Sequence, residues 1–132
     1  MSDYRIVEAA ELLGVSDDTL RRWIDAGRVT ASSDSAGRTR IAGADLARLA
    51  RSLAETDDSG ATRASAVSAR NRMRGIVTEV KKDPVMAQVE LVCGPYRIVS
   101  LMSSEAADEL RLEPGVVAIA SVKSTNVVVE LP

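Results

Sequence analysis

Histidine and phenylalanine are absent from this sequence, and cysteine occurs once, as Cys93. Without histidine, a zinc site of the usual histidine and cysteine type is excluded, and a lone thiol cannot form a disulfide within one chain. A single thiol is typical of a reducing compartment, so we expect a cytoplasmic protein. The same absences argue against an enzyme, because a nucleophilic site needs a base beside its nucleophile.

Aromatic residues are also scarce, at 2% of the chain, although 45% of the residues are hydrophobic. The cores must therefore be built from aliphatic side chains. No apolar run approaches the roughly 20 residues that a membrane-spanning helix needs, and the first residues lack a signal-peptide profile. We therefore expect no membrane partner. Each half of the chain is small, and domains of that size are marginal unless they associate, so we predict a homo-oligomer.

The formal net charge of −2 gives no overall attraction to nucleic acid. The cations are unevenly placed, however, because every one before residue 55 is arginine and the lysines all follow residue 80. Arginine favours bidentate contacts with phosphate and guanine. A coding bias toward arginine would give the same composition, so the positions of the arginines must carry the argument.

Residues 1–54 have the pattern of a small helical domain. A first helix ends at Gly14, a second begins at the N-cap Ser16, and a polar stretch over residues 28–41 is long enough for a hairpin or wing before a third helix. The apolar stripes are Val7, Ala10 and Leu13; Leu20, Trp23 and Ile24; and Leu46, Leu49, Ala50 and Leu53. Two short helices joined by a tight turn predict a helix-turn-helix.

The Gly-Val-Ser turn at residues 14–16, the Thr-Leu-Arg-Arg-Trp run at residues 19–23 and Gly27 together resemble the MerR/excisionase-type winged helix-turn-helix family. The resemblance covers residues 4–54. It implies that the second helix enters the major groove of double-stranded DNA and that the wing touches the backbone. The candidate DNA-binding residues are Ser16, Thr19, Arg21 and Arg22 on the helix, with Arg38 and Arg40 in the wing.

Each of these residues has an alternative interpretation. Arg21 and Arg22 could belong to a solvated helix surface, and Asp17 and Asp18 favour the helix dipole over a base contact. We interpret Trp23 as a core residue of the domain and not as a platform for base stacking.

Residues 55–67 are small, polar and aperiodic, which predicts a linker. A period of two then replaces the helical period through residue 131. Strands are expected near residues 76–81, 87–91, 96–101, 116–122 and 126–131, with a short helix over residues 103–110. We therefore predict an α+β protein in which residues 68–132 form a five-stranded OB-like β-barrel with one short helix.

The run Ser-Ala-Arg-Asn-Arg-Met-Arg-Gly at residues 68–75 resembles the opening of a Mop domain, the molybdate-binding branch of the TOBE superfamily. The segments at residues 101–115 and 119–127 resemble its helix, turn and closing strand. The resemblance implies a site for molybdate or tungstate between subunits. Its ligand-contacting residues match Ser68, Arg70, Ser103, Lys123 and Ser124. Where the family often has a second serine, this sequence has Ala106, so one donor is missing.

These residue types suit a tetrahedral dianion. Arg70 and Lys123 supply positive charge, the serines supply hydroxyls, and a helix N-terminus supplies free N–H groups. None of these groups has to accept a proton, which fits unprotonated molybdate better than hydrogen phosphate. Taken separately, Arg70, Arg72 and Arg74 could be a solvated face of a strand, and residues 123–125 could be an ordinary polar turn. We interpret Asn71 as fixing the local turn.

Together, the two resemblances predict a DNA-binding regulator that responds to molybdate or tungstate. Two alternatives stay open at this point. One is an intracellular molybdate storage protein whose first domain is an adaptor. The other is an excisionase-like architectural factor whose barrel serves only to dimerise it.

Overall fold

The computed structural model describes residues 2–56 and 71–132. The chain divides into two compact units, Met1–Ser59 and Gly60–Pro132, and each is described by itself. Among the described residues, no helix has the length and apolar character needed to cross a membrane. The exact limits predicted for the domains and the linker stay a prediction.

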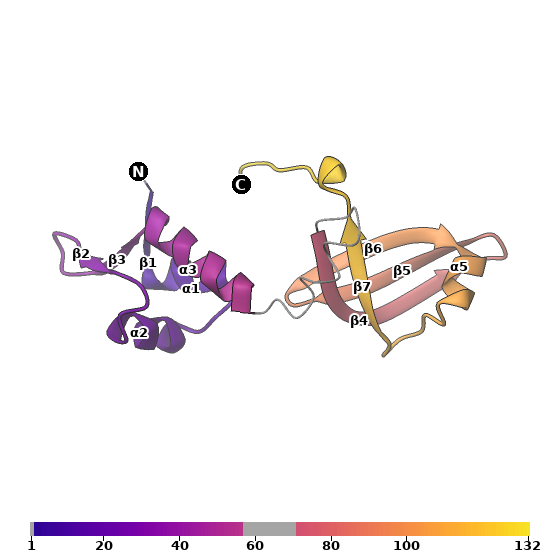
Figure 1. Ribbon diagram of the computed structural model, residues 1–132, viewed down its shortest axis with the longest axis horizontal. Coiled ribbons are helices and arrows are strands. Elements are labelled where there is room, and N and C mark those ends of the chain that lie inside the picture. Colours follow the sequence, from indigo (N-terminus) through magenta and orange to yellow (C-terminus); the bar gives the residue numbers. More distant parts are fainter. Residues whose placement is uncertain (1, 57–70) are drawn as a thin grey trace. The chain divides into compact units, whose positions relative to one another are not determined.

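The first unit contains three helices and a small sheet (Figure 1). Its elements are β1 (Asp3–Arg5), α1 (Ile6–Leu13), α2 (Asp17–Asp25), β2 (Ser32–Ser33), β3 (Thr39–Ala42) and α3 (Gly43–Thr56). The strands pair antiparallel in the order β1-β3-β2. The predicted hairpin between α2 and α3 is thus confirmed. Strand β1 was not predicted, because three residues are too few to reveal a period of two.

The turn between α1 and α2 follows the local chemistry that the sequence predicted. Gly14 ends α1 in the left-handed conformation, with φ at 70°, which glycine adopts without steric cost. Ser16 caps α2, since its Oγ accepts a hydrogen bond from the backbone N–H of Thr19 at 3.1 Å. The two helices are therefore joined by a short, fixed connection.

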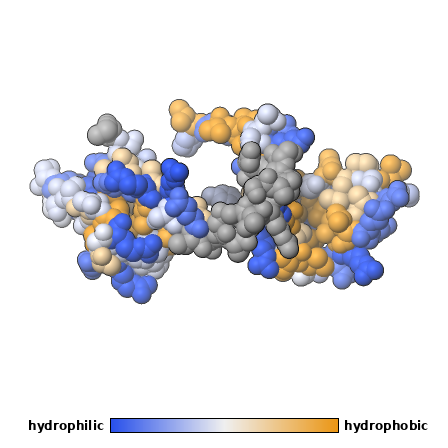
Figure 2. Space-filling view, in the orientation of Figure 1, coloured by the Kyte–Doolittle hydropathy of each residue, from blue (hydrophilic) through white to orange (hydrophobic). Residues whose placement is uncertain are grey.

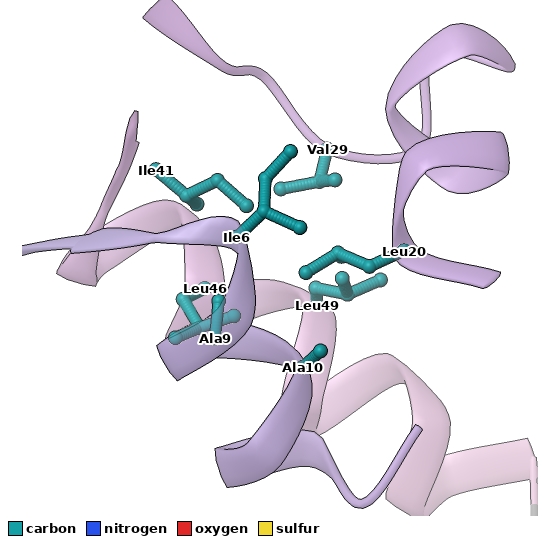
Figure 3. Packing of buried hydrophobic residues seen from close by; sticks show 8 residues of the cluster. All are labelled: Ile6, Ala9, Ala10, Leu20, Val29, Ile41, Leu46 and Leu49. Carbon is teal, nitrogen blue, oxygen red and sulfur yellow. The ribbon is translucent and has the colours of Figure 1, made fainter. Parts of the chain in front are cut away.

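The core of the first unit lies where the three helices and β3 meet (Figure 3). Leu20 and Ile41 are fully buried, and the remaining buried members are Ile6, Ala9, Ala10, Val29, Leu46 and Leu49. The predicted stripes of α2 and α3 are confirmed by this packing. The stripe of α1 was wrong at one position, because Val7 is 59% exposed and Ile6 and Ala9 are buried in its place.

The second unit is a curled antiparallel sheet with one short helix (Figure 1). Its elements are β4 (Asn71–Lys82), β5 (Met86–Cys93), β6 (Tyr96–Ser103), α5 (Ser104–Glu109), β7 (Val117–Val122) and the 3₁₀ turn η1 (Ser124–Asn126). The strand order is β6-β5-β4-β7, so β6 and β7 form the two edges. Ser103 caps α5, as predicted, by accepting from the N–H of Ala106 at 3.1 Å.

The predicted fifth strand at residues 126–131 is not formed, and the five-stranded barrel is corrected to a four-stranded half-barrel. After η1 the chain continues as a tail, which we define as Val127–Leu131 and which pairs with no strand among the described residues. The segment has the β-branched composition of a strand. A strand also needs a neighbouring edge, and among the described residues the tail pairs with neither edge of its own sheet, β6 or β7.

The inner face of the curled sheet holds a small aliphatic core. Val77, Val89, Leu91 and Cys93 are buried there, as expected for Cys93. A bulge between Val77 and Glu79 shifts the register of β4 against β5, so the simple alternation predicted for this strand is interrupted. Met73 and Met102 pack against this core as predicted, whereas Met86 was assigned wrongly to the interior, because it is 45% exposed at the start of β5.

Candidate functional site

The exposed face of α2 carries a connected set of polar side chains. The hydroxyls of Ser16 and Thr19 lie 2.9 Å apart, and Arg22 donates from Nη2 to Thr19 Oγ1 at 3.3 Å. Arg21 and Arg22 are both exposed on the helix. The structure thus brings together the four predicted DNA-binding residues of this helix on one short element, where side chains can reach a groove.

Trp23 has a structural position in the same helix. It packs partly against the core of the first unit. Its ring also lies beneath the guanidinium of Arg28, with 4.9 Å from Cζ to the ring centroid. Both contacts agree with the prediction that this ring is not a surface for base stacking.

The hairpin positions its two arginines differently. Asp34 Oδ1 accepts hydrogen bonds from the backbone N–H groups of Arg38 and Ala36, both at 2.9 Å. These bonds lower the pKa of Asp34, and the bond from Arg38 has the larger effect. The side chain of Arg38 is exposed, and its Nε lies 3.4 Å from Oδ2 of Asp34. Arg40 lies on β3 and donates to Asp3 Oδ1 at 2.7 Å. Arg38 is therefore the cation of the hairpin with more exposed surface, while Arg40 is anchored to β1.

Two of the candidate oxyanion residues, Lys123 and Ser124, lie at one end of the β4–β7 pair. The last described pair of this ladder is Asn71 with Val122, and Asn71 Nδ2 donates to the carbonyl of Val122 at 3.1 Å. Lys123 follows directly and precedes η1, which begins at Ser124. Ser68 and Arg70 lie outside the described residues. The bond from Asn71 is structural, but it joins β4 to β7 and does not fix a local turn, which is what we predicted for this residue.

Ser103 lies at the other end of the same sheet. It pairs with Met86 at the start of β5, beside the end of β4 at Lys82. Since a strand rises about 3.3 Å per residue, the eleven steps from Asn71 to Lys82 amount to roughly 30 Å or more along β4. Within one chain, the structure therefore does not bring Ser103 together with Lys123 and Ser124.

Arg72 is a further candidate that the sequence reasoning left on a solvated face. Its Nη1 is shielded from solvent and has no hydrogen-bond partner among the described residues, although an unpaired buried donor is costly. Arg72 pairs with Ser121, so these two positions share one face of the ladder, and Lys123 follows the last ladder residue, Val122. The periodicity could not separate Arg72 from Arg74, which is exposed.

The described residues contain no group of three or more acidic or cysteine side chains that could hold a metal ion. The donors at the end of the β4–β7 ladder are instead ammonium, guanidinium and hydroxyl groups. Such groups hold an anion, because they donate hydrogen bonds and carry positive charge.

Two family models match the chain, and together they account for most of it. Residues 4–54 match a helix-turn-helix domain. Residues 67–129 match the TOBE domain. The two matches follow each other along the sequence in the order that the two resemblances predicted.

Curated relatives match the second half of the chain. Molybdenum-pterin-binding protein 2 from Clostridium pasteurianum is 39% identical over 64 residues, which are 48% of this chain and 94% of that protein. Molybdenum transport protein ModE from Herbaspirillum seropedicae is 40% identical over 62 residues, which are 46% of this chain but only 23% of that protein.

Solved structures align with the same half. MopII from Clostridium pasteurianum is 38% identical and covers 49% of this chain and 98% of its own, with a TM-score of 0.47. The cytoplasmic molybdate-binding protein ModG, solved with molybdate bound, is 36% identical, with 52% of this chain and 51% of its own covered and a TM-score of 0.48.

Proposed function

Because this chain belongs to the TOBE-domain family of molybdenum-pterin-binding proteins through its second half and carries a helix-turn-helix domain in its first, we propose that it is a molybdate-responsive transcriptional regulator. Molybdate binds to the second domain and changes the affinity of the first for DNA. Tungstate, which has nearly the same size and charge, is a second ligand for the same site.

One observation carries this proposal, namely the joining of the two domains in a single chain. A protein that only binds an oxyanion does not require a helix that exposes Arg21 and Arg22 beside a capped N-terminus. The identity with the molybdenum transport protein ModE over the TOBE half supports a link to molybdenum. A DNA-binding domain and an oxyanion-binding domain together are the two parts that a one-component sensor needs.

The proposed oxyanion site is centred on Lys123 and Ser124, with Ser68 and Arg70 from the segment that precedes β4. Lys123 lies directly beyond the last described ladder pair, and Arg70 precedes that pair in the sequence. Arg72 joins the site, because its Nη1 has no acceptor in the part of the chain that the structure describes and an oxyanion supplies one. These cationic and hydroxyl groups can all donate hydrogen bonds, and none of them has to accept a proton from the ligand. Such a set suits an unprotonated MO4 dianion.

We place the site between subunits, with Ser103 contributed by another copy. The separation of Ser103 from Lys123 along one sheet supports this arrangement, since the two can share a ligand only across an interface. A ligand that bridges copies favours the associated state by mass action. Association pairs the helix-turn-helix domains, and paired domains bind a two-part DNA site more tightly than single ones.

Isothermal titration calorimetry of the full chain with molybdate, tungstate, sulfate and phosphate tests the ligand. Gel-shift assays with the duplex upstream of its own coding sequence, with and without molybdate, test the regulation. We expect micromolar or tighter binding of molybdate and tungstate and a molybdate-dependent change in the gel shift. If saturating molybdate and tungstate change neither the DNA affinity nor the assembly state, the regulator proposal is wrong.

A storage or buffering role is the second candidate. It is favoured by one finding, that a molybdenum-pterin-binding relative is matched over 94% of its length by the TOBE half alone. In that case the chain binds molybdate, but the gel-shift assay gives no complex with the upstream duplex. An excisionase-like architectural role predicts the reverse result, with DNA binding and no heat of binding for molybdate.

A further inference from the structure

The arginines of the first unit differ in whether an acidic side chain neutralises them. Five of the eight form such an ion pair, and the other three, Arg21, Arg22 and Arg28, pair with no carboxylate among the described residues. Arg21 and Arg22 are the cations of α2 that the proposed function already uses. Arg28 follows the end of α2 by three residues, and its charge is likewise left without a partner. The paired arginines are Arg5, Arg38, Arg40, Arg48 and Arg51.

The chain folds Arg28 back onto the last turn of α2. The N–H of Gly27 donates to the carbonyl of Ile24 at 3.0 Å. The N–H of Arg28 donates to the carbonyl of Trp23 at 2.9 Å, and this pair of bonds is a common way to close a helix. The same turn places the guanidinium of Arg28 over the ring of Trp23. The ring contacts the face of the guanidinium, so the N–H groups at its edge stay available for an acceptor.

A hollow of about 280 Å³ lies beside Arg28, between the loop that follows α2 and helix α3. Its polar lining includes Arg28, Thr30, Asp45 and Arg48. Arg48 donates from Nη1 to Asp45 Oδ1 at 3.2 Å, so the charges of these two residues offset each other. The net charge of the hollow is therefore that of Arg28, and the exposed Thr30 adds a hydroxyl. Such a combination favours an anion.

The length of α2 relates this hollow to the DNA groove. Its nine residues extend over about 14 Å at ~1.5 Å per residue, and the major groove is about 12 Å wide. A helix that presents Ser16 and Thr19 to the base edges therefore ends near the rim of the groove, where the phosphates lie. Figure 2 shows hydrophilic residues over much of the visible face of the first unit, which suits a charged partner.

We propose that this hollow binds one backbone phosphate of the duplex, with Arg28, stacked on Trp23, as the cation that holds it. The inference rests on the proposed function, because it requires a duplex at α2. A phosphate contact carries no sequence information and strengthens binding to every duplex alike. Arg28 thus supplies affinity beside a helix whose other residues face the bases.

The test measures binding of the full chain and its Arg28→Gln variant to the upstream duplex and to a scrambled duplex of equal length, over a range of salt concentrations. We expect the variant to bind both duplexes roughly fivefold more weakly, and the slope of log affinity against log salt to fall by about 1. The matched control is Arg51→Gln, which removes the same charge from α3 and should keep the parental slope. Far-ultraviolet circular dichroism checks that each variant is folded.

The fluorescence of Trp23 reports on the hollow directly, because it is the only tryptophan of the chain. We expect the upstream duplex to change its emission in the parent chain and to change it much less in Arg28→Gln. Titration with inorganic phosphate distinguishes a free anion from the DNA backbone. A change in emission at micromolar phosphate that the duplex does not displace would overturn the assignment to DNA.

The inference and the proposed function fail in different ways. If the parent chain binds the upstream duplex and Arg28→Gln keeps its affinity and salt slope, the phosphate contact is wrong and the regulator proposal stands. If Arg28→Gln weakens binding but molybdate leaves both DNA affinity and assembly unchanged, the contact stands and the regulator proposal is wrong. A parent chain that binds neither duplex would overturn both.

Discussion

Arg21 and Arg22 are the residues on which we propose that DNA binding most depends. Both are exposed on α2, and Arg22 is oriented by its bond to Thr19. We expect Arg21→Gln and Arg22→Gln each to weaken binding to the upstream duplex by about tenfold or more, since one good arginine contact contributes ~1–3 kcal/mol. A phosphate contact would also reduce the slope of log affinity against log salt by about 1.

The matched control for these substitutions is Arg51→Gln. Arg51 is an exposed arginine on α3 that pairs with Glu55 at 3.3 Å, so the change removes the same charge from another element. It should leave the salt slope within error of the parent chain. Equal losses in all three variants would mean that only net charge matters, and the recognition role of α2 would be wrong.

Lys123 is the cation that tests the oxyanion site. Replacing it with glutamine keeps a polar side chain, one atom shorter, and removes the charge. Because a hydrogen bond to a charged group contributes about 1.5–3 kcal/mol, we expect the Kd for molybdate to rise by more than tenfold. Arg72→Gln should have an effect in the same direction. Lys81→Gln is the control, since Lys81 is exposed and pairs with Glu79 at 3.6 Å; an equal loss there would contradict the site.

Asp83 controls part of the acid stability of the second unit. Its carboxylate accepts from the N–H groups of Met86 and Val85, both at 2.8 Å, and these bonds, that of Met86 first, lower its pKa from 3.8. The stabilisation is therefore complete above pH 3.8 and is lost as the pH falls through the lower folded value. Asp83→Asn should flatten the fall in unfolding free energy below about pH 4. Urea denaturation at several pH values measures this, with Glu109→Gln as the control.

At the scale of elements, Gly75 determines how closely β4 and β5 approach. A Cβ at this position would lie 2.4 Å from the carbonyl oxygen of Val92 and 2.6 Å from Cys93 Sγ. Gly75→Ala should therefore force the strands apart and cost about 1–3 kcal/mol of unfolding free energy, as overpacking does. Adding Cys93→Ala should restore only part of the loss, because the backbone oxygen remains. Full rescue by that second change would contradict the backbone contact.

The sequence predicted the helices of the first unit better than the last strand of the second. Gly14 and Ser16 act within their own turn, so their chemistry fixes the ends of α1 and α2 wherever the rest of the chain lies. The tail has the composition of a strand, but a strand also needs a neighbour to pair with, and the local sequence does not show whether one is present. The same limit applies to the oxyanion residues, because Ser103 and Lys123 lie at opposite ends of one sheet and the resemblance alone did not reveal that distance.

At the scale of the whole molecule, the proposed coupling between oxyanion and DNA is reciprocal. If molybdate changes the affinity for the upstream duplex by some factor, the duplex must change the affinity for molybdate by the same factor. We expect a factor of about 5–150, the usual range for such coupling. Because the ligand is proposed to act through association of copies, both factors should approach one when the protein is diluted until it is monomeric.

Titration of molybdate into the protein with and without saturating duplex measures one side of this cycle, and gel shifts with and without molybdate measure the other. Agreement of the two factors would identify a single coupled equilibrium. A molybdate effect on DNA binding with no return effect would mean that the two titrations report different species, such as a separate aggregate. A coupling that survives at a dilution where the protein is monomeric would place its origin within one chain, and ligand-driven association would then be the wrong mechanism.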